Sequence, residues 1–152
     1  MLEKTFGSRK ANTIYQERVG AYGIGFDHEQ KIPVVMTPLL DGRTGCFLPG
    51  GGIEHNETHA ACIIRECLEE AGLHVIPREL ICKIDYYHFI EQTRTNIYGI
   101  GYFYTMEIKG VVSEPTEKDS VLTWLTLAEV KERLFFPHQI WAVEQAFQHH
   151  GR

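Results

Sequence analysis

The first third of the 152-residue chain alternates short apolar runs with polar turns, a pattern typical of β-strands joined by tight connections. Polar residues at 27–30 and a glycine-containing segment at 41–45 are predicted to form turns. The runs expected to form strands are residues 13–19, 21–26, 31–40 and 46–48. The opening part of the chain is therefore expected to be β-structure.

The character of the chain changes at residues 49–52, where a proline and three glycines predict a loop. A helix is predicted over residues 57–71, because apolar side chains recur there at helical spacing. The predicted apolar stripe consists of Ala60, Ile64, Cys67, Leu68 and Ala71. Asn56 is expected to cap the start of this helix, and Gly72 to end it in the left-handed conformation, with Leu73 as its hydrophobic partner.

The remaining sequence returns to β-patterns and then to helices. Residues 79–90 and 95–108 are rich in isoleucine and aromatic residues and predict a long hairpin. An acidic loop is expected over residues 112–120, a short strand over 121–125, a helix over 127–134 and a final helix that begins at Pro137. The whole chain, residues 1–152, is interpreted as one mixed α/β (α+β) domain.

Composition narrows the functional classes. Hydrophobic residues make up 43% of the chain, which is too apolar for disorder, and no run approaches the ~20 residues of a membrane span. The net charge of −5 argues against a nucleic-acid partner. The four cysteines form no zinc-binding spacing, and no signal peptide is recognised, so a cytoplasmic protein without a membrane partner is expected.

Three glutamates give the predicted central helix its chemistry. Glu66, Glu69 and Glu70 stand at i, i+3 and i+4, so they share a face, which is expected to point away from the core. Residues 54–70 hold five glutamates against one arginine. Mg²⁺ binds through carboxylates and substrate phosphates, so a metal site is one interpretation of this cluster. From spacing alone, a solvated acidic face is the equally weighted alternative.

The pattern around these glutamates is longer than the helix. Gly51, Glu57 and the segment from Arg65 to Leu73 resemble the Nudix box, G-x5-E-x7-R-E-U-x-E-E-x-G-U, which would cover residues 51–73. Cys67 departs from the pattern, because it occupies an aliphatic position. The resemblance implies a Nudix-type α/β/α sandwich, with a mixed central sheet, the box helix and a C-terminal helix. It also implies MutT-like hydrolysis of a nucleoside diphosphate linked to another group.

The resemblance also implies residue roles. Glu69 and Glu70 would ligate Mg²⁺ or Mn²⁺, and Glu66 would ligate the metal or act as the base. The backbone carbonyl of Gly50 or Gly51 would complete the ligand set. Glu57 and Arg65 would support the site, with Arg65 orienting Glu66 or Glu57. A further acidic ligand is expected from the loop before residue 121, where the candidates are Glu114, Glu117 and Asp119.

The substrate is less well defined by the sequence. Arg94, Phe47 and His138 are candidate substrate contacts, although a core or solvated role is the alternative for each. Signatures of the ADP-ribose, dinucleoside polyphosphate and NADH subfamilies are absent, so the expected substrate is a nucleoside triphosphate or related nucleotide. The alternative is a non-catalytic nucleotide-sensing Nudix-like domain. Short strands and exposed hairpins are compatible with a homodimer.

Overall fold

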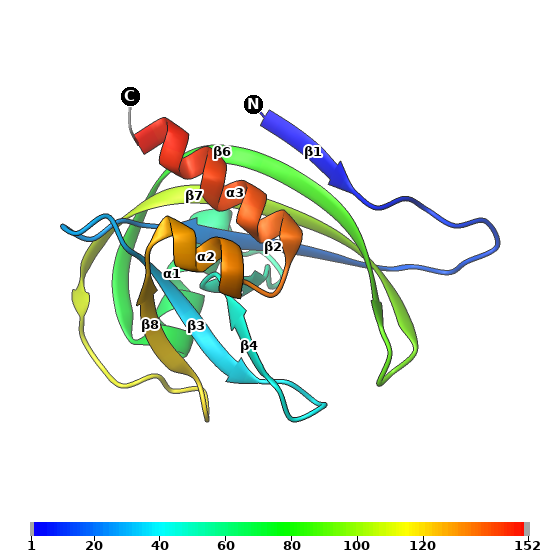
Figure 1. Ribbon diagram of the computed structural model, residues 1–152, viewed down its shortest axis with the longest axis horizontal. Helices are drawn as coiled ribbons and strands as arrows, with labels where there is room; N and C mark the ends of the chain where they lie inside the picture. The colour runs from blue at the N-terminus through cyan, green and yellow to red at the C-terminus, as the bar shows by residue number, and fades with distance from the viewer. Residues whose placement is uncertain (1, 151–152) are drawn as a thin grey trace.

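The computed structural model describes residues 2–150, which form strands and helices arranged in layers (Figure 1). The strands are β1 (Leu2–Phe6), β2 (Gln16–Ile24), β3 (Ile32–Pro38), β4 (Thr44–Phe47), β5 (Gly50–Gly52), β6 (Leu73–Ile90), β7 (Thr95–Val111) and β8 (Val121–Leu125). The helices are α1 (His59–Ala71), α2 (Leu127–Arg133) and α3 (Pro137–His150).

Two sheets form the frame. The larger one is mixed and has the order β1-β6-β7-β2-β5, with β1 parallel to β6 and β2 parallel to β7. The smaller one is antiparallel and has the order β4-β3-β8. Helix α1 packs against β2, β5 and β6 on the far side in Figure 1, and α2 and α3 lie on the near side, with α3 on β6. The expected α/β/α arrangement is confirmed.

The β-structure departs from the sequence prediction in three places. The two runs over residues 13–26 form a single strand, β2. The predicted loop over residues 49–52 is wrong for Gly50–Gly52, because these residues pair antiparallel with β2 as strand β5. Strand β1 was not predicted, since its side chains are mostly exposed and give it no apolar face. The long hairpin is confirmed as β6 paired with β7.

Helix α1 begins later than predicted and buries a different face. Thr58, not Asn56, is the N-cap, and its side chain accepts a hydrogen bond from the Ala61 amide at 3.1 Å. Asn56 instead has a φ of +63°, in the left-handed region. Gly72 ends the helix in the left-handed conformation, as predicted. The predicted apolar stripe is partly wrong. Ala60 is exposed, Ile64 and Leu68 are 43% and 41% exposed, and the buried face consists of Cys62, Ile63, Cys67 and Ala71.

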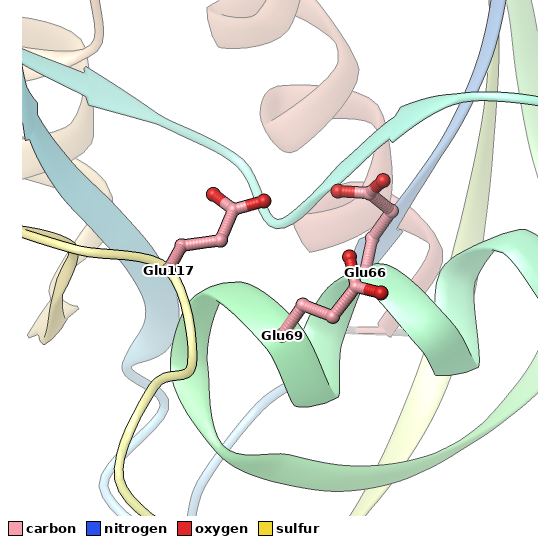
Figure 2. Close-up of side chains that lie close together, drawn as sticks. All are labelled: Glu66, Glu69 and Glu117. Carbon is pink, nitrogen blue, oxygen red and sulfur yellow. The ribbon is translucent and has the colours of Figure 1, made fainter.

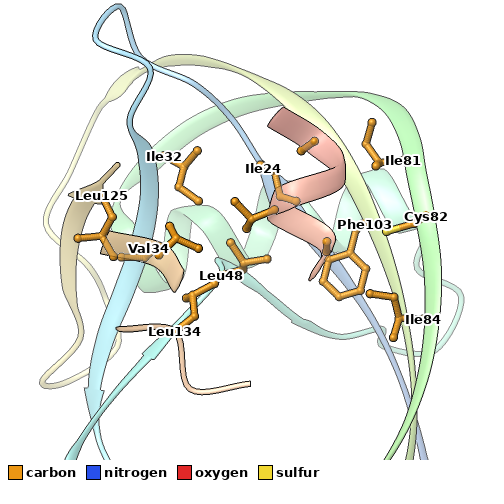
Figure 3. Packing of buried hydrophobic residues seen from close by; sticks show 14 of the residues in the cluster. Ile24, Ile32, Val34, Leu48, Ile81, Cys82, Ile84, Phe103, Leu125 and Leu134 are labelled. Atoms are coloured by element: carbon orange, nitrogen blue, oxygen red, sulfur yellow. The ribbon is translucent and has the colours of Figure 1, made fainter. Parts of the chain in front are cut away.

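The core has two parts. One lies between the sheets and α3 and includes Ile24, Val34, Leu48, Ile84 and Phe103 (Figure 3). The other lies beneath α1 and is formed by its buried residues with Ala21, Val35, Leu73, Val75 and Met106. The four cysteines are buried and free. Among residues 2–150, no helix is long and apolar enough to cross a membrane.

Candidate metal centre and active site

Three glutamates from two parts of the chain converge on one point (Figure 2). Glu66 and Glu69 come from α1, and Glu117 comes from the loop between β7 and β8. Each offers a carboxylate oxygen, and these oxygens lie within 4.8 Å of one another. The donors are all carboxylate oxygens, with no thiolate or imidazole among them, which is the set that Mg²⁺ and Mn²⁺ prefer. The cluster therefore fits a hard divalent cation.

The backbone of α1 holds the Glu117 loop in place. The carbonyl oxygen of Glu69 accepts hydrogen bonds from the amides of Thr116 and Glu117, at 2.8 and 3.0 Å. The carbonyl of Gly72 accepts one from the Val112 amide at 2.8 Å. The end of the helix thus has its free carbonyls satisfied by this loop. Of the three acidic candidates in the loop, only Glu117 joins the cluster; Glu114 and Asp119 are exposed and outside it.

Arg65 connects the cluster to the start of the box. Its guanidinium donates two hydrogen bonds to the Glu57 carboxylate, at 2.7 and 2.9 Å, and one to Glu66 Oε1 at 2.7 Å. It also reaches the Gly52 carbonyl at 3.2 Å and Glu69 Oε2 at 3.4 Å. The hydrogen bonds from Arg65 lower the pKa of Glu57 to about 2. Arg65 therefore orients both carboxylates that the sequence paired with it, and it offsets their repulsion.

Glu70 occupies a different environment from the other two helix glutamates. Its Oε1 accepts a hydrogen bond from the Gly50 amide at 3.0 Å. Burial, followed by repulsion from Glu66, Glu117 and Glu69, raises its pKa to about 8. Glu70 belongs to neither part of the core, but it is half-buried and its carboxylate bonds to strand β5 through the Gly50 amide. Glu70 lies beside the Glu66–Glu69–Glu117 cluster but is not one of its three members.

The two candidate carbonyl ligands differ in their hydrogen bonding. The Gly23 amide donates a hydrogen bond to the Pro49 carbonyl, and the Ile53 amide donates one to the Val19 carbonyl. These two bonds lie on either side of the Ala21–Gly51 pair, where β2 pairs with β5. Hydrogen-bonded pairs alternate with non-hydrogen-bonded pairs along antiparallel strands. The amide and carbonyl of Gly51 therefore point toward β2, and those of Gly50 point away from it. The bond from the Gly50 amide to Glu70 agrees with this orientation. Of the two candidates, the Gly50 carbonyl is therefore the one that β2 does not engage.

A cleft with a volume of about 200 Å³ opens beside Glu70 and Glu117. Phe47, a predicted substrate contact, is part of its wall. The wall residues that were not foreseen include Tyr22, Phe136 and Gln139. The periodicity of a sequence does not distinguish a side chain that lines a cleft from one that lies in the core. The sequence pattern therefore did not identify these residues as part of the site.

The other two predicted substrate contacts lie elsewhere. Arg94 is exposed in the turn of the β6–β7 hairpin, with a φ of +52°, and it is not part of the cleft wall. His138 is 3% exposed, and its ring stacks on Tyr86 with centroids 3.8 Å apart. The structure thus places His138 in the core, which was the alternative interpretation of this residue.

We expect His138 to make the protein less stable in mild acid. Burial, with a smaller contribution from His88, lowers the pKa of His138 from 6.5 to about 3. Between these values the unfolded chain binds a proton that the folded protein excludes, so stability falls as the pH drops below 6.5. The expected loss between pH 7 and 5 is about 2 kcal/mol. Urea unfolding should show a flatter pH profile for His138→Phe and an unchanged one for the exposed control His55→Gln. Equal slopes for all three proteins would contradict the prediction.

Comparisons with known proteins show the family and the fold of the chain. The NUDIX domain family profile matches residues 16–145. A NUDIX hydrolase from Nitrosomonas europaea superposes with a TM-score of 0.70, at 15% identity, over 88% of this chain and 90% of that one. The E. coli ORF135 protein gives a TM-score of 0.64, at 17% identity, over 88% of this chain and 91% of that one.

A third structure, the MutT protein from Methanosarcina mazei Go1, gives a TM-score of 0.60, at 15% identity, over 93% of this chain and 100% of that one. At these identities the structures support the fold alone. No curated protein matches the sequence. The family profile spans most of the chain and includes every residue of the box, and on this basis the chain belongs to the Nudix family of pyrophosphohydrolases.

Proposed function

We propose that this protein hydrolyses a pyrophosphate bond in a nucleoside triphosphate or a related nucleotide, with Mg²⁺ or Mn²⁺ as cofactor. The observation that carries the proposal is the convergence of Glu66, Glu69 and Glu117 beside a cleft. A purely solvated acidic face would not require the Glu117 loop to be anchored on the helix carbonyl next to the other two carboxylates. The cleft provides room for the substrate next to these carboxylates.

Each residue of the site has a role in this proposal. Glu66, Glu69, Glu117 and the Gly50 carbonyl would hold the metal, with Glu70 beside them. The bound cation would supply charge neutralisation of the phosphates and activation of water. Glu66 is proposed as the proton acceptor, because Arg65 fixes its Oε1 while Oε2 has no hydrogen-bond donor among residues 2–150. Arg65 and Glu57 act as positioning residues, since Arg65 contacts the carboxylates of Glu66 and Glu69 and the Gly52 carbonyl, and Glu57 holds Arg65.

The proposal is tested by hydrolysis assays on a panel of nucleotides with Mg²⁺, with Mn²⁺ and with a chelator. The panel should contain ordinary and oxidised triphosphates, nucleotide sugars, ADP-ribose and dinucleoside polyphosphates. We expect turnover that requires the metal and that stops when the chelator is added. Tight nucleotide binding without turnover on any member would favour the alternative, a nucleotide-sensing domain.

We further propose a cytoplasmic location, which the four free cysteines support, because thiols persist in reducing compartments. A small-molecule nucleotide is the proposed partner. Homodimer formation stays a prediction.

Two neighbouring glycines provide a matched test of how strictly Glu66 is positioned. A Cβ atom on Gly51 would lie 2.9 Å from Cδ of Glu66, whereas one on Gly52 would meet nothing within 4 Å. We expect Gly51→Ala to lower kcat/KM by about 10- to 100-fold, because a carboxylate displaced by a fraction of an ångström loses its productive geometry. The control Gly52→Ala should stay near wild type, and both variants should melt close to it. Similar activity of the two variants would contradict a strict requirement for this Glu66 position.

A further inference from the structure

A second cavity adjoins the cleft beside the metal cluster. Its volume is about 280 Å³, and it shares Tyr22 and Phe136 with the wall of the cleft. Strands β2, β6 and β7 supply most of its wall, and Gly52 and Phe136 complete it. The proposed chemistry uses none of this space. A substrate with its phosphates in the cleft can therefore extend into the second cavity.

The two spaces carry opposite charges. The wall of the cleft holds Glu70 and Glu117 and, among the residues that the structure describes, no lysine or arginine. The wall of the second cavity, described over the same residues, holds Arg18 and no aspartate or glutamate. An anionic group that the metal does not bind is therefore repelled in the cleft and attracted in the second cavity.

Strand β2 directs Arg18 into this cavity. Side chains alternate along a strand, so Arg18, Gly20 and Tyr22 share one face of the sheet. Burial raises the pKa of Tyr86, and the positive charge of Arg18 offsets part of this rise, so the guanidinium lies near this phenol. Within residues 2–150, Arg18 forms no ion pair with a carboxylate. Its charge is therefore available to a ligand.

Two phenol hydroxyls lie over glycines in the same region of the sheet. A Cβ atom on Gly20 would lie 2.8 Å from the hydroxyl oxygen of Tyr22, and one on Gly99 would lie 2.6 Å from that of Tyr86. Gly99 pairs with Arg18 of β2 and with Tyr86 of β6, so these three residues form a row across the sheet. The guanidinium and the two hydroxyls are donors of the kind that bind a phosphate group.

We propose that the second cavity, with Arg18 as its cation, binds a phosphate group of the substrate that lies outside the scissile pyrophosphate. The substrate class is then a nucleotide that carries a further phosphate on a ribose hydroxyl. This inference rests on the proposed nucleotide hydrolysis and adds a second anionic group to the substrate. Arg18 acts on substrate choice, because the wall of its cavity contains none of the metal-binding carboxylates.

The test uses ligand pairs that differ only in a ribose phosphate. The 3′,5′-bisphosphates of adenosine, guanosine, cytidine and uridine are compared with the matching 5′-monophosphates by calorimetry with Mg²⁺. The ratio of kcat/KM is measured for NADPH and NADH, and for coenzyme A and its 3′-dephospho form. We expect the wild type to prefer the phosphorylated member by about tenfold or more in each pair that it accepts, because a hydrogen bond between charged groups contributes that much. The preference should shrink at high salt, which screens the contact.

Arg18→Gln is the informative variant, because it removes the charge and keeps a polar side chain. It should abolish the preference and leave the Kd of the 5′-monophosphates unchanged. Arg18→Lys keeps the charge and should retain part of the preference. Arg94→Gln makes the same chemical change at an exposed arginine outside both cavity walls, and it should leave the preference as in the wild type. Melting curves establish that the variants are folded.

The outcomes separate this inference from the proposed function. Binding or turnover without a preference for the phosphorylated member in the wild type overturns the inference alone. A preference that survives in Arg18→Gln also overturns it, since the further phosphate would then be bound elsewhere. An equal loss for both members of a pair has the same consequence, because it assigns Arg18 to a shared part of the nucleotide or to structure. Neither binding nor turnover with any ligand overturns the inference together with the proposed hydrolysis.

Discussion

Replacing Glu69 by glutamine is expected to lower metal-dependent turnover by about 10³-fold or more and to leave the protein folded. The Glu69 carboxylate is one of the three that converge on the candidate metal position, and a neutral amide cannot supply its charge. The fold should persist because the Glu117 loop is held by the backbone carbonyl of Glu69, which the substitution keeps. The side chain itself is 40% exposed, so its replacement leaves no cavity in the core.

Three measurements on this variant decide between chemistry and structure. Turnover should fall and binding of Mn²⁺ should weaken, while the melting temperature should stay close to the wild type. Glu114→Gln is the control, because Glu114 is an exposed glutamate of the same loop region that lies outside the cluster. A parallel loss of folding and activity would assign the cluster a structural role. Undiminished turnover would place the active site elsewhere.

The helix glutamates could be predicted from the sequence because their relation is local. Spacing of three and four residues places Glu66, Glu69 and Glu70 on one helix face whatever the rest of the chain does. The same spacing could not distinguish the environments of the three. Glu70 depends on the Gly50 amide, and the Glu66–Glu69 pair depends on Glu117, a residue 48 positions beyond Glu69. These partners are brought together by tertiary packing.

The same distinction explains which parts of the fold were predicted. The β6–β7 hairpin joins neighbouring segments and has strong β-formers, so its pattern was sufficient. Strand β1 pairs with β6, about 80 residues further along the chain, and its exposed side chains show no alternation. The buried face of α1 was misassigned because Cys62 and Ile63 lie on the sheet side, whereas the equally apolar Ile64 and Leu68 face outward. When apolar residues occur on both sides of a helix, their periodicity does not identify one face as the buried one.

Gly72→Ala should be the most destabilising of the glycine substitutions proposed here. Gly72 has a φ of +65°, and a Cβ atom there would lie 1.9 Å from the carbonyl oxygen of Ser113. Its carbonyl also holds the Val112 amide, so the helix end and the Glu117 loop pack directly against each other. We expect a loss of about 3 kcal/mol in the free energy of unfolding: about 1 from the left-handed backbone and the rest from displacing the Ser113 backbone.

Gly42→Ala separates these two contributions. Gly42 also has a positive φ, +89°, but a Cβ atom there would meet nothing within 4 Å. Urea unfolding should therefore show a loss of only about 1 kcal/mol for Gly42→Ala. Gly72→Ala should in addition weaken Mn²⁺ binding in the folded protein, because a loop pushed off the helix end moves Glu117 away from Glu66 and Glu69. Equal destabilisation by the two variants would mean that displacing the Glu117 loop costs no free energy of unfolding. Full destabilisation with intact metal binding would mean that Glu117 does not depend on the packing of the loop against Gly72.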